Sequence, residues 1–159
     1  MQLRAAQSTD LEAVYDLIKE LAAHQNAAEE VSLSLAQFKK DFTQANPPFS
    51  ILICEKEKEV LGFALYFYTY STWKGKCLYL EDIYVKKTCR KQGVGRKLMN
   101  ALAKEAQKAG AKRMAWQVLD SNHGAIAFYE KMPTNRSASW INVKIESDNL
   151  EKLYQNDGF

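Results

Sequence analysis

The residues best placed to do chemistry lie in one stretch, Leu78–Met99, which reads LYLEDIYVKKTCRKQGVGRKLM. The stretch begins as a strand, continues as a basic loop with glycines, and becomes a helix whose first turn contains Gly93–Lys97. This order aims backbone N–H groups and the positive end of a helix at one point, which can bind a pyrophosphate or another polyanion. Glu81 and Asp82 precede the loop on the same strand, where they could hold or deprotonate a reacting group. The stretch therefore predicts an enzyme that uses a phosphorylated cofactor.

The composition favours one globular domain covering residues 1–159. A chain of 159 residues can bury about two-thirds of its unfolded surface, and a hydrophobic fraction of 47% argues for a true core. The net charge is only +3, from 22 basic and 19 acidic residues, so nucleic acid is not an expected partner. Basic residues do cluster between Lys86 and Lys97. Such a run is as often a solvated surface, but the glycines inside it favour anion binding.

Cysteine and histidine usage predicts reduced thiols and no metal site. The cysteines are Cys54, Cys77 and Cys89. They show no CxxC spacing and no signal peptide precedes them, so we expect a cytoplasmic protein. His24 and His123 form no ligand pattern with them. The longest nearly apolar run, Val60–Tyr68, is too short for a membrane span, so we expect a soluble protein without a membrane partner.

Hydrophobic periodicity and turn signals place the elements that must position these residues. The expected helices cover about 9–23, 34–43, 94–108 and 120–131, with a short helical tail after 145. The expected strands cover about 2–6, 50–55, 60–69, 78–85, 112–118 and 139–145. Thr9 and Glu12 have the spacing of a capping box, and Ser34 stands at a second helix start. The order of elements predicts a single mixed α/β domain of the α+β type, without repeats or linkers.

Several motifs together resemble the GNAT superfamily of N-acetyltransferases. Arg90–Gly95, RKQGVG, follows a strand and is similar to the family signature Arg/Gln-x-x-Gly-x-Gly/Ala. Tyr79–Val85, YLEDIYV, resembles the family's fourth strand, and Asn122 with Ala127–Lys131 resembles its fourth helix. The turn Ser71–Lys76, STWKGK, is similar to that of one branch, the diamine (spermidine/spermine) and thialysine N-acetyltransferases. The likeness runs nearly end to end.

The resemblance implies a fold, a cosubstrate and a set of binding residues. The fold would be a mostly antiparallel twisted sheet flanked by helices, with a bulge that splays the fourth and fifth strands to admit the thioester of acetyl-CoA. Backbone N–H groups of Gln92–Arg96 would bind the pyrophosphate, and Ile83–Val85 would pair with the pantetheine arm like an added strand. The implied cofactor-binding residues are Ile83, Tyr84, Val85, Arg90, Lys91, Gln92, Gly93, Val94, Gly95, Arg96, Asn122 and Tyr129.

The implied chemistry needs a base and an acid. Alkyl amines are almost wholly protonated near neutral pH, so the attacking amine must lose a proton. The proposed base of the polyamine branch stands at the position of Glu81, which would act through water. From the residues alone, a strand carboxylate paired with a lysine is the commoner interpretation. Asp82 would face the other side of a regular strand unless a bulge disturbed it, and we expect a structural or electrostatic role for it.

Tyr129 would lie near the cofactor sulfur and donate a proton to the departing thiolate. A Phe-Tyr pair on a helix is otherwise more often core packing. A strand N–H near Ile83 would stabilise the oxyanion. No Ser–His–Asp or Cys–His arrangement suggests a covalent intermediate, so we expect direct transfer.

The substrate is less closely indicated. Carboxylates that could line a channel for a cationic amine are Glu29, Glu30, Glu81 and Asp82. In the polyamine branch a Tyr-Glu pair after the first helix helps to read the substrate's charge, whereas this chain has His24-Gln25 there. A shorter diamine or a lysine-like amino acid such as thialysine is then as well supported as spermidine or spermine. A second departure is Met132-Pro133-Thr134, where the family usually has Gly-Ala, so the helix before it must end differently.

Two other functions remain open. One is acetylation of a protein or peptide amine, and the other is a CoA-binding regulatory module without catalysis. The intact Glu81 and Tyr129 argue against the second. Members of the branch are usually homodimers, so the resemblance also implies a homodimer.

Overall fold

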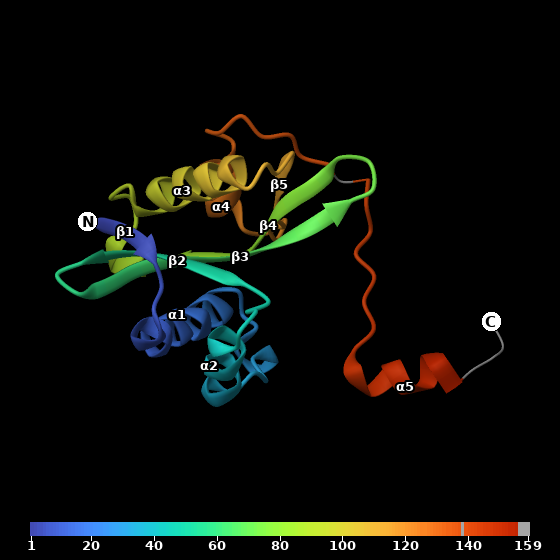
Figure 1. Ribbon diagram of the computed structural model, residues 1–159. Helices are drawn as coiled ribbons and strands as arrows, with labels where there is room; N and C mark the ends of the chain where they lie inside the picture. Colours follow the sequence, from blue (N-terminus) through green and yellow to red (C-terminus); the bar gives the residue numbers. More distant parts are fainter. Residues whose placement is uncertain (138, 156–159) are drawn as a thin grey trace. The chain divides into compact units, whose positions relative to one another are not determined.

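The computed structural model describes residues 1–137 and 139–155 (Figure 1). The chain divides into two compact units, Met1–Gln117 and Val118–Phe159. The first unit contains one sheet of five strands in the order β1-β2-β3-β4-β5. Neighbouring strands are antiparallel except β4 and β5, which are parallel. This is the mixed α/β arrangement that the order of elements predicts, with the mostly antiparallel sheet that the resemblance implies.

The strands are β1 (Gln2–Ala5), β2 (Ser50–Lys56), β3 (Glu59–Ser71), β4 (Gly75–Val85) and β5 (Arg113–Ala115). The helices of the first unit are α1 (Leu11–His24), α2 (Leu35–Thr43) and α3 (Val94–Lys108), with short 3-10 turns η1 (Ser8–Asp10), η2 (Ala28–Glu30) and η3 (Lys87–Cys89). The second unit contains α4 (His123–Tyr129) and α5 (Ser147–Gln155). Among the described residues, no helix has both the length and the apolar character needed to cross a bilayer.

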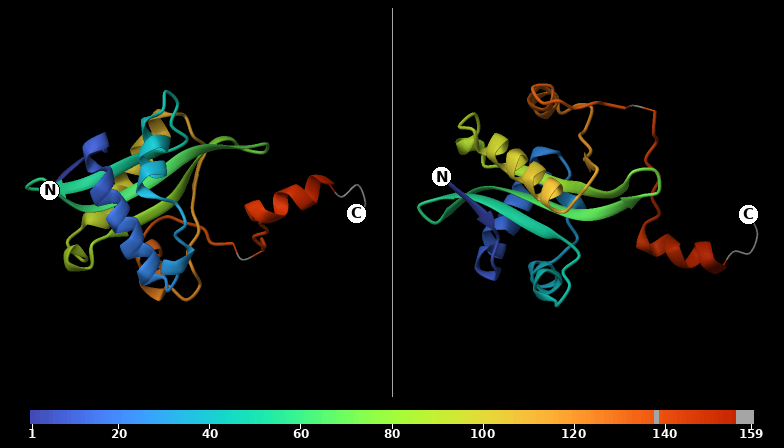
Figure 2. Two further views of the ribbon diagram at one scale, coloured as in Figure 1. Left: turned by 90° about the horizontal axis from the view of Figure 1, so that it is seen from below. Right: turned by 45° about the horizontal axis from the view of Figure 1, so that its top comes forward.

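Helices cover both faces of the sheet, with α1 and α2 on one face and α3 on the other (Figures 1 and 2). On the first face, Leu17 and Phe38 pack with inward residues of β2, β3 and β4 in one buried cluster. On the second face, Leu98 and Leu102 of α3 are completely buried. Burying side chains of this size contributes about 1.5–3 kcal/mol each, so the sheet is held from both sides.

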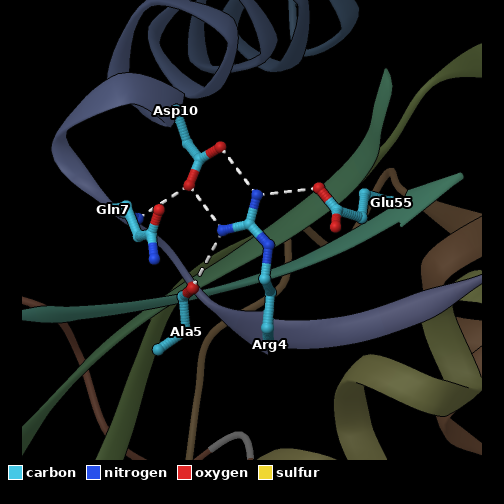
Figure 3. A network of polar contacts seen from close by, with 5 residues as sticks. All are labelled: Arg4, Ala5, Gln7, Asp10 and Glu55. Atoms are coloured by element: carbon cyan, nitrogen blue, oxygen red, sulfur yellow. Dashed lines mark hydrogen bonds and ion pairs between the residues drawn. The ribbon is translucent and has the colours of Figure 1, made fainter. Parts of the chain in front are cut away.

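The start of α1 differs from the prediction and is tied to two strands. The capping box expected at Thr9 and Glu12 is wrong, because the box is formed by Gln7 and Asp10 around η1. The Gln7 N–H donates to Asp10 Oδ2 at 2.7 Å. Asp10 also accepts from Arg4 Nη1 at 2.6 Å and Nη2 at 2.9 Å, and Arg4 Nη2 donates to Glu55 at 2.7 Å (Figure 3). Asp10 is fixed by Arg4, which itself pairs with Glu55 from β2, 51 positions away, so the contact that ties the cap to the sheet is not visible in the local spacing.

Other helix boundaries agree closely with the sequence. The Ser34 side chain accepts from the Gln37 N–H at 3.1 Å at the head of α2, as the spacing predicts. Helix α3 has the predicted bounds, and Gly110 follows it with a φ of +69°. These boundaries are set by capping residues that are close in sequence, so they can be predicted from the sequence.

Three segments near the C-terminus differ from the prediction. The strand expected over 112–118 is shortened to β5, and the helix expected over 120–131 is the shorter α4. The strand expected over 139–145 is wrong, because residues 139–146 have no regular structure and pair with none of the described strands. Alternating polar and apolar side chains favour a β-strand, but the strand forms only where its backbone can hydrogen-bond to a neighbouring strand.

Candidate functional site

A β-bulge in β4 places the two acidic residues of the strand on one face of the sheet. Tyr66 of β3 pairs with Leu80, but the next pair is Leu65 with Asp82, so Glu81 is an extra residue in the ladder. Leu65 belongs to the core cluster beneath α1, and Asp82 therefore lies on the α1 face. Glu81 follows Leu80, which lies on the opposite face, so Glu81 also turns toward α1. In a regular strand these two side chains would point to opposite faces of the sheet, and the bulge turns them to the same face.

The two carboxylates differ in exposure. Glu81 is exposed, whereas Asp82 is partly buried. Burial, followed by the nearby charge of Glu81, raises the pKa of Asp82 to about 6. Among the described residues neither carboxylate has an ion pair or a hydrogen bond to another side chain. The lysine-paired strand carboxylate considered from the sequence is thus not the arrangement found here.

The first turn of α3 and the loop before it form an uncapped arrangement of backbone N–H groups, here called the cradle. Gly93 at the N-cap has a left-handed φ of +85°, and Lys91 before it also has a positive φ of +62°. No side chain caps this end, and no acidic residue lies in the first turn. The first intrahelical bond runs from the Lys97 N–H to the Gly93 carbonyl at 3.0 Å, so the N–H groups of Val94–Arg96 have no carbonyl partner within the helix. Such an end attracts phosphate groups.

Arg90 lies at the junction of the cradle, β4 and α1. Its Nε donates to the Val85 carbonyl at 3.2 Å, and its guanidinium lies 5.2 Å from the centre of the Tyr84 ring. Its Nη1 lies 3.5 Å from His24 Nε2 at the end of α1. The structure therefore brings His24 and Arg90 together, and it gives Arg90 the role of anchoring the cradle loop to β4. Gln25, the residue after His24, is exposed.

Strand β4 pairs with β5 only along a short part of its length, and the residues of β4 after Tyr79 have no partner in β5. The parallel ladder joins Cys77–Tyr79 to Arg113–Ala115 and ends there. Ile83, Tyr84 and Val85 pair with β3 on their other side, and no described strand pairs with their second edge. This is the divergence of the fourth and fifth strands that the resemblance implies. An edge of this kind can accept an extended ligand as an added strand.

Gly62 of β3 is a site residue that the sequence reasoning missed. A Cβ atom at this position would lie 2.6 Å from the Tyr84 carbonyl oxygen, closer than side chains tolerate. Only glycine lets β3 approach β4 where Ile83–Val85 offer their edge. The available signal was a glycine inside an otherwise apolar strand, which often marks a close backbone approach.

Two of the predicted residues belong to the second unit. Asn122 caps α4 by accepting from the Ala125 N–H at 3.1 Å. Tyr129 is buried at the end of α4, and burial raises its pKa to about 12, so its hydroxyl stays protonated at neutral pH. Their roles beside the cofactor stay predictions. In the described part of the chain, no group of three or more His, Cys, Asp or Glu side chains could hold a metal ion.

Comparison with known proteins agrees with this geometry. Residues 11–132 match the model of the acetyltransferase (GNAT) family. The chain is 30% identical to a mouse thialysine N-epsilon-acetyltransferase over 96% of both proteins. It is also 35% identical to a human spermidine/spermine N(1)-acetyltransferase-like protein, over 80% of this chain and 19% of that protein.

Solved structures share the fold. An integron cassette protein of V. cholerae superposes with a TM-score of 0.80 at 21% identity, covering 98% of both chains. An aminoglycoside acetyltransferase from an uncultured soil sample superposes with a TM-score of 0.76 at 16% identity, covering 91% of this chain and 95% of that one.

Proposed function

Because the chain belongs to the acetyltransferase (GNAT) family and is an acyltransferase, we propose that it transfers the acetyl group of acetyl-CoA directly to a primary amine of a small polyamine, diamine or lysine-like (thialysine) substrate. The observation that carries this proposal is the course of β4. Its bulge presents two carboxylates that have no side-chain partner among the described residues, and its end leads through a basic loop into the uncapped start of α3. An acid/base pair and an anion cradle thus belong to one continuous segment.

The residues around the cradle fit the chemistry of coenzyme A. The backbone N–H groups of Gln92–Arg96 would bind the pyrophosphate, with the charges of Lys91 and Arg96 nearby. Ile83–Val85 would bind the pantetheine arm along the open edge of β4. Asn122 is the further cofactor contact that the resemblance implies. Acetyl-CoA, when bound, supplies a thioester that an amine can attack.

The chain's own groups would then handle charge and protons. The pair of Glu81, the base predicted from the sequence, and Asp82 would attract the substrate ammonium group and remove its proton. A backbone N–H near Ile83 would donate to the oxyanion. The Tyr129 hydroxyl, kept protonated by its raised pKa, would donate to the departing thiolate. No covalent enzyme intermediate is required.

The substrate class rests on the relatives and on charge. The two curated relatives are named for thialysine and for spermidine/spermine, which all present a primary amine on a short flexible chain. The carboxylate pair suits such a cation. His24 and Gln25 would lie on the side of the site that binds the amine, where Arg90, which contacts His24, would add a positive charge. This favours a substrate with fewer positive charges than spermine.

The proposal extends to assembly and location. We propose a homodimer, by analogy with the polyamine branch of the family. We also propose a cytoplasmic location, supported by three cysteines that are all free in the structure.

A thiol-release assay tests the function. Wild-type protein with acetyl-CoA is offered spermidine, spermine, putrescine, lysine, thialysine and a short peptide, beside Glu81→Gln and Tyr129→Phe. We expect turnover with one class of small amine and at least a tenfold loss of kcat/KM in both variants. Glu57→Gln is the matched control, because Glu57 is an exposed carboxylate in the β2–β3 turn.

Other outcomes of the assay have definite meanings. Turnover with the peptide alone would establish a protein or peptide acetyltransferase instead. Tight binding of acetyl-CoA without turnover of any amine would favour a regulatory module. Absence of acetyl-CoA binding would contradict the cradle itself.

A further inference from the structure

Within the proposed reaction, on which this inference rests, we infer that Asp82 accepts the proton from the substrate ammonium group, while the outer carboxylate Glu81 attracts and holds that group. This reverses the roles that the sequence predicts for the two residues. It adds Asp82 to the catalytic residues and makes Glu81 a residue that determines binding of the cation.

The bulge supplies the geometric basis. It turns both side chains to the α1 face. A substrate nitrogen bound between them would contact both carboxylates. Glu81 is on the solvent side of the pair, and Asp82 is partly buried beside the edge of β4 that leads to the cradle. The ladder neighbour of Asp82 is the buried Leu65, which offers no hydrogen bond to its carboxylate. A partly buried carboxylate without a cation beside it is a stronger proton acceptor than one surrounded by water.

The charges around Asp82 agree with this division of roles. The groups coupled to Asp82 by charge are Glu81 and Tyr79, both on β4. Glu20 of α1 and Arg90 of the cradle loop act on the neighbouring Tyr84, and Arg90 also contacts His24. Burial is the main cause that raises the pKa of Asp82 to about 6, and the charge of Glu81 adds to it. A base is most effective when its pKa lies near the working pH, because it is then both ionised and basic. The Arg90 guanidinium donates to the Val85 carbonyl, lies over the Tyr84 ring and contacts His24, so its contacts are with these residues and not with Asp82.

The proton-transfer step balances with the groups named. An N–H bond of the ammonium group breaks, an O–H bond forms on an Asp82 carboxylate oxygen, and the electron pair stays on nitrogen. That pair would then form the bond to the acetyl carbon, and the electrons of the broken C–S bond would leave with sulfur. The nitrogen would lose its second proton as the amide forms, and this proton would restore the one that the proposed acid Tyr129 gives to the thiolate. Asp82 later releases its proton to water. The step needs no oxidant, reductant or metal.

Two measurements on the full chain test the inference. The first is the pH dependence of kcat/KM for wild type, Asp82→Asn and Glu81→Gln. Wild type should lose activity as the pH falls through about 6. Asp82→Asn should lower kcat about 100-fold and abolish this acidic limb. Glu81→Gln should raise the KM for the amine, keep kcat within about threefold, and move the limb to lower pH, because loss of the neighbouring charge lowers the pKa of Asp82.

The second measurement does not depend on turnover. An NMR titration of the side-chain carboxyl groups in the protein without ligand should show Asp82 titrating near pH 6 in wild type and at lower pH in Glu81→Gln. If Asp82→Asn is unstable to thermal unfolding, Asp82→Glu replaces it, with partial activity and a retained acidic limb expected. An Asp82 that titrates near pH 4 overturns the inference. So does an acidic limb that survives in Asp82→Asn and vanishes in Glu81→Gln.

Failure of this inference is distinguishable from failure of the proposed function. A wild-type protein that turns over an amine, with the limb assigned to Glu81, refutes the role of Asp82 alone. A wild-type protein without turnover of any amine refutes the proposed function, and the role of Asp82 falls with it.

Discussion

Gly93 is the single residue on whose backbone the anion cradle most directly depends. Its φ of +85° turns the chain into α3 with the first N–H groups of the helix exposed. A side chain at such a φ costs about 1–2 kcal/mol. We therefore expect Gly93→Ala to lower the free energy of unfolding by about that amount and to weaken acetyl-CoA binding about tenfold. Denaturant unfolding and calorimetric titration measure the two effects.

Gly110 provides a matched control for Gly93. It also has a positive φ, +69°, and open space around its Cβ position, but it lies beyond the other end of α3. Gly110→Ala should cost a similar free energy of unfolding and leave acetyl-CoA binding unchanged. Equal losses of binding in the two variants would show that strain, and not the cradle, controls affinity.

At the scale of elements, Asp10 joins η1 and the start of α1 to β1 and, through Arg4, to β2. Arg4 holds the pKa of Asp10 below its usual value. The stabilisation from Asp10 is therefore complete above the pKa of the unfolded chain, about 4, and is lost as the pH falls through the lower pKa of the folded state. We expect Asp10→Asn to cost about 1–3 kcal/mol at pH 7 and much less at pH 2, measured by urea unfolding.

The control for Asp10 is Asp16→Asn. Asp16 pairs with Lys19 on the exposed surface of α1, where a salt bridge contributes about 0–1 kcal/mol. An Asp10→Asn variant whose cost equals that of Asp16→Asn, or stays the same at both pH values, would contradict the anchoring role.

For the whole molecule, cofactor binding should appear as added stability. A ligand at 100 times its Kd stabilises the folded state by about 2.7 kcal/mol. For a chain of this size we expect acetyl-CoA at that concentration to raise Tm by about 5–10 °C in a thermal scan. Adenosine, which lacks the pyrophosphate, should give little shift. If adenosine raised Tm as much as acetyl-CoA does, the pyrophosphate would not be a main contributor to binding.

Features that depend on neighbours in sequence could be predicted from the sequence alone. The bounds of α3 follow from helical spacing and from Gly93 and Gly110, and the cap at Ser34 follows from its distance to Gln37. The cradle is likewise local, because a strand, a glycine-containing loop and a helix start suffice to form it. The same segment carried the resemblance to the family that the comparisons confirm.

Features that depend on pairing between distant segments were decided only by the tertiary structure. The extra residue at Glu81 exists only relative to the β3 ladder, and it alone turns Asp82 to the α1 face. Arg4, which fixes the cap residue Asp10, is held by Glu55, 51 positions away, and Arg90 faces His24, 66 positions away. Residues 139–145 alternate like a strand but have no described partner. A backbone ladder and a desolvated carboxylate both require a neighbour that folding alone supplies.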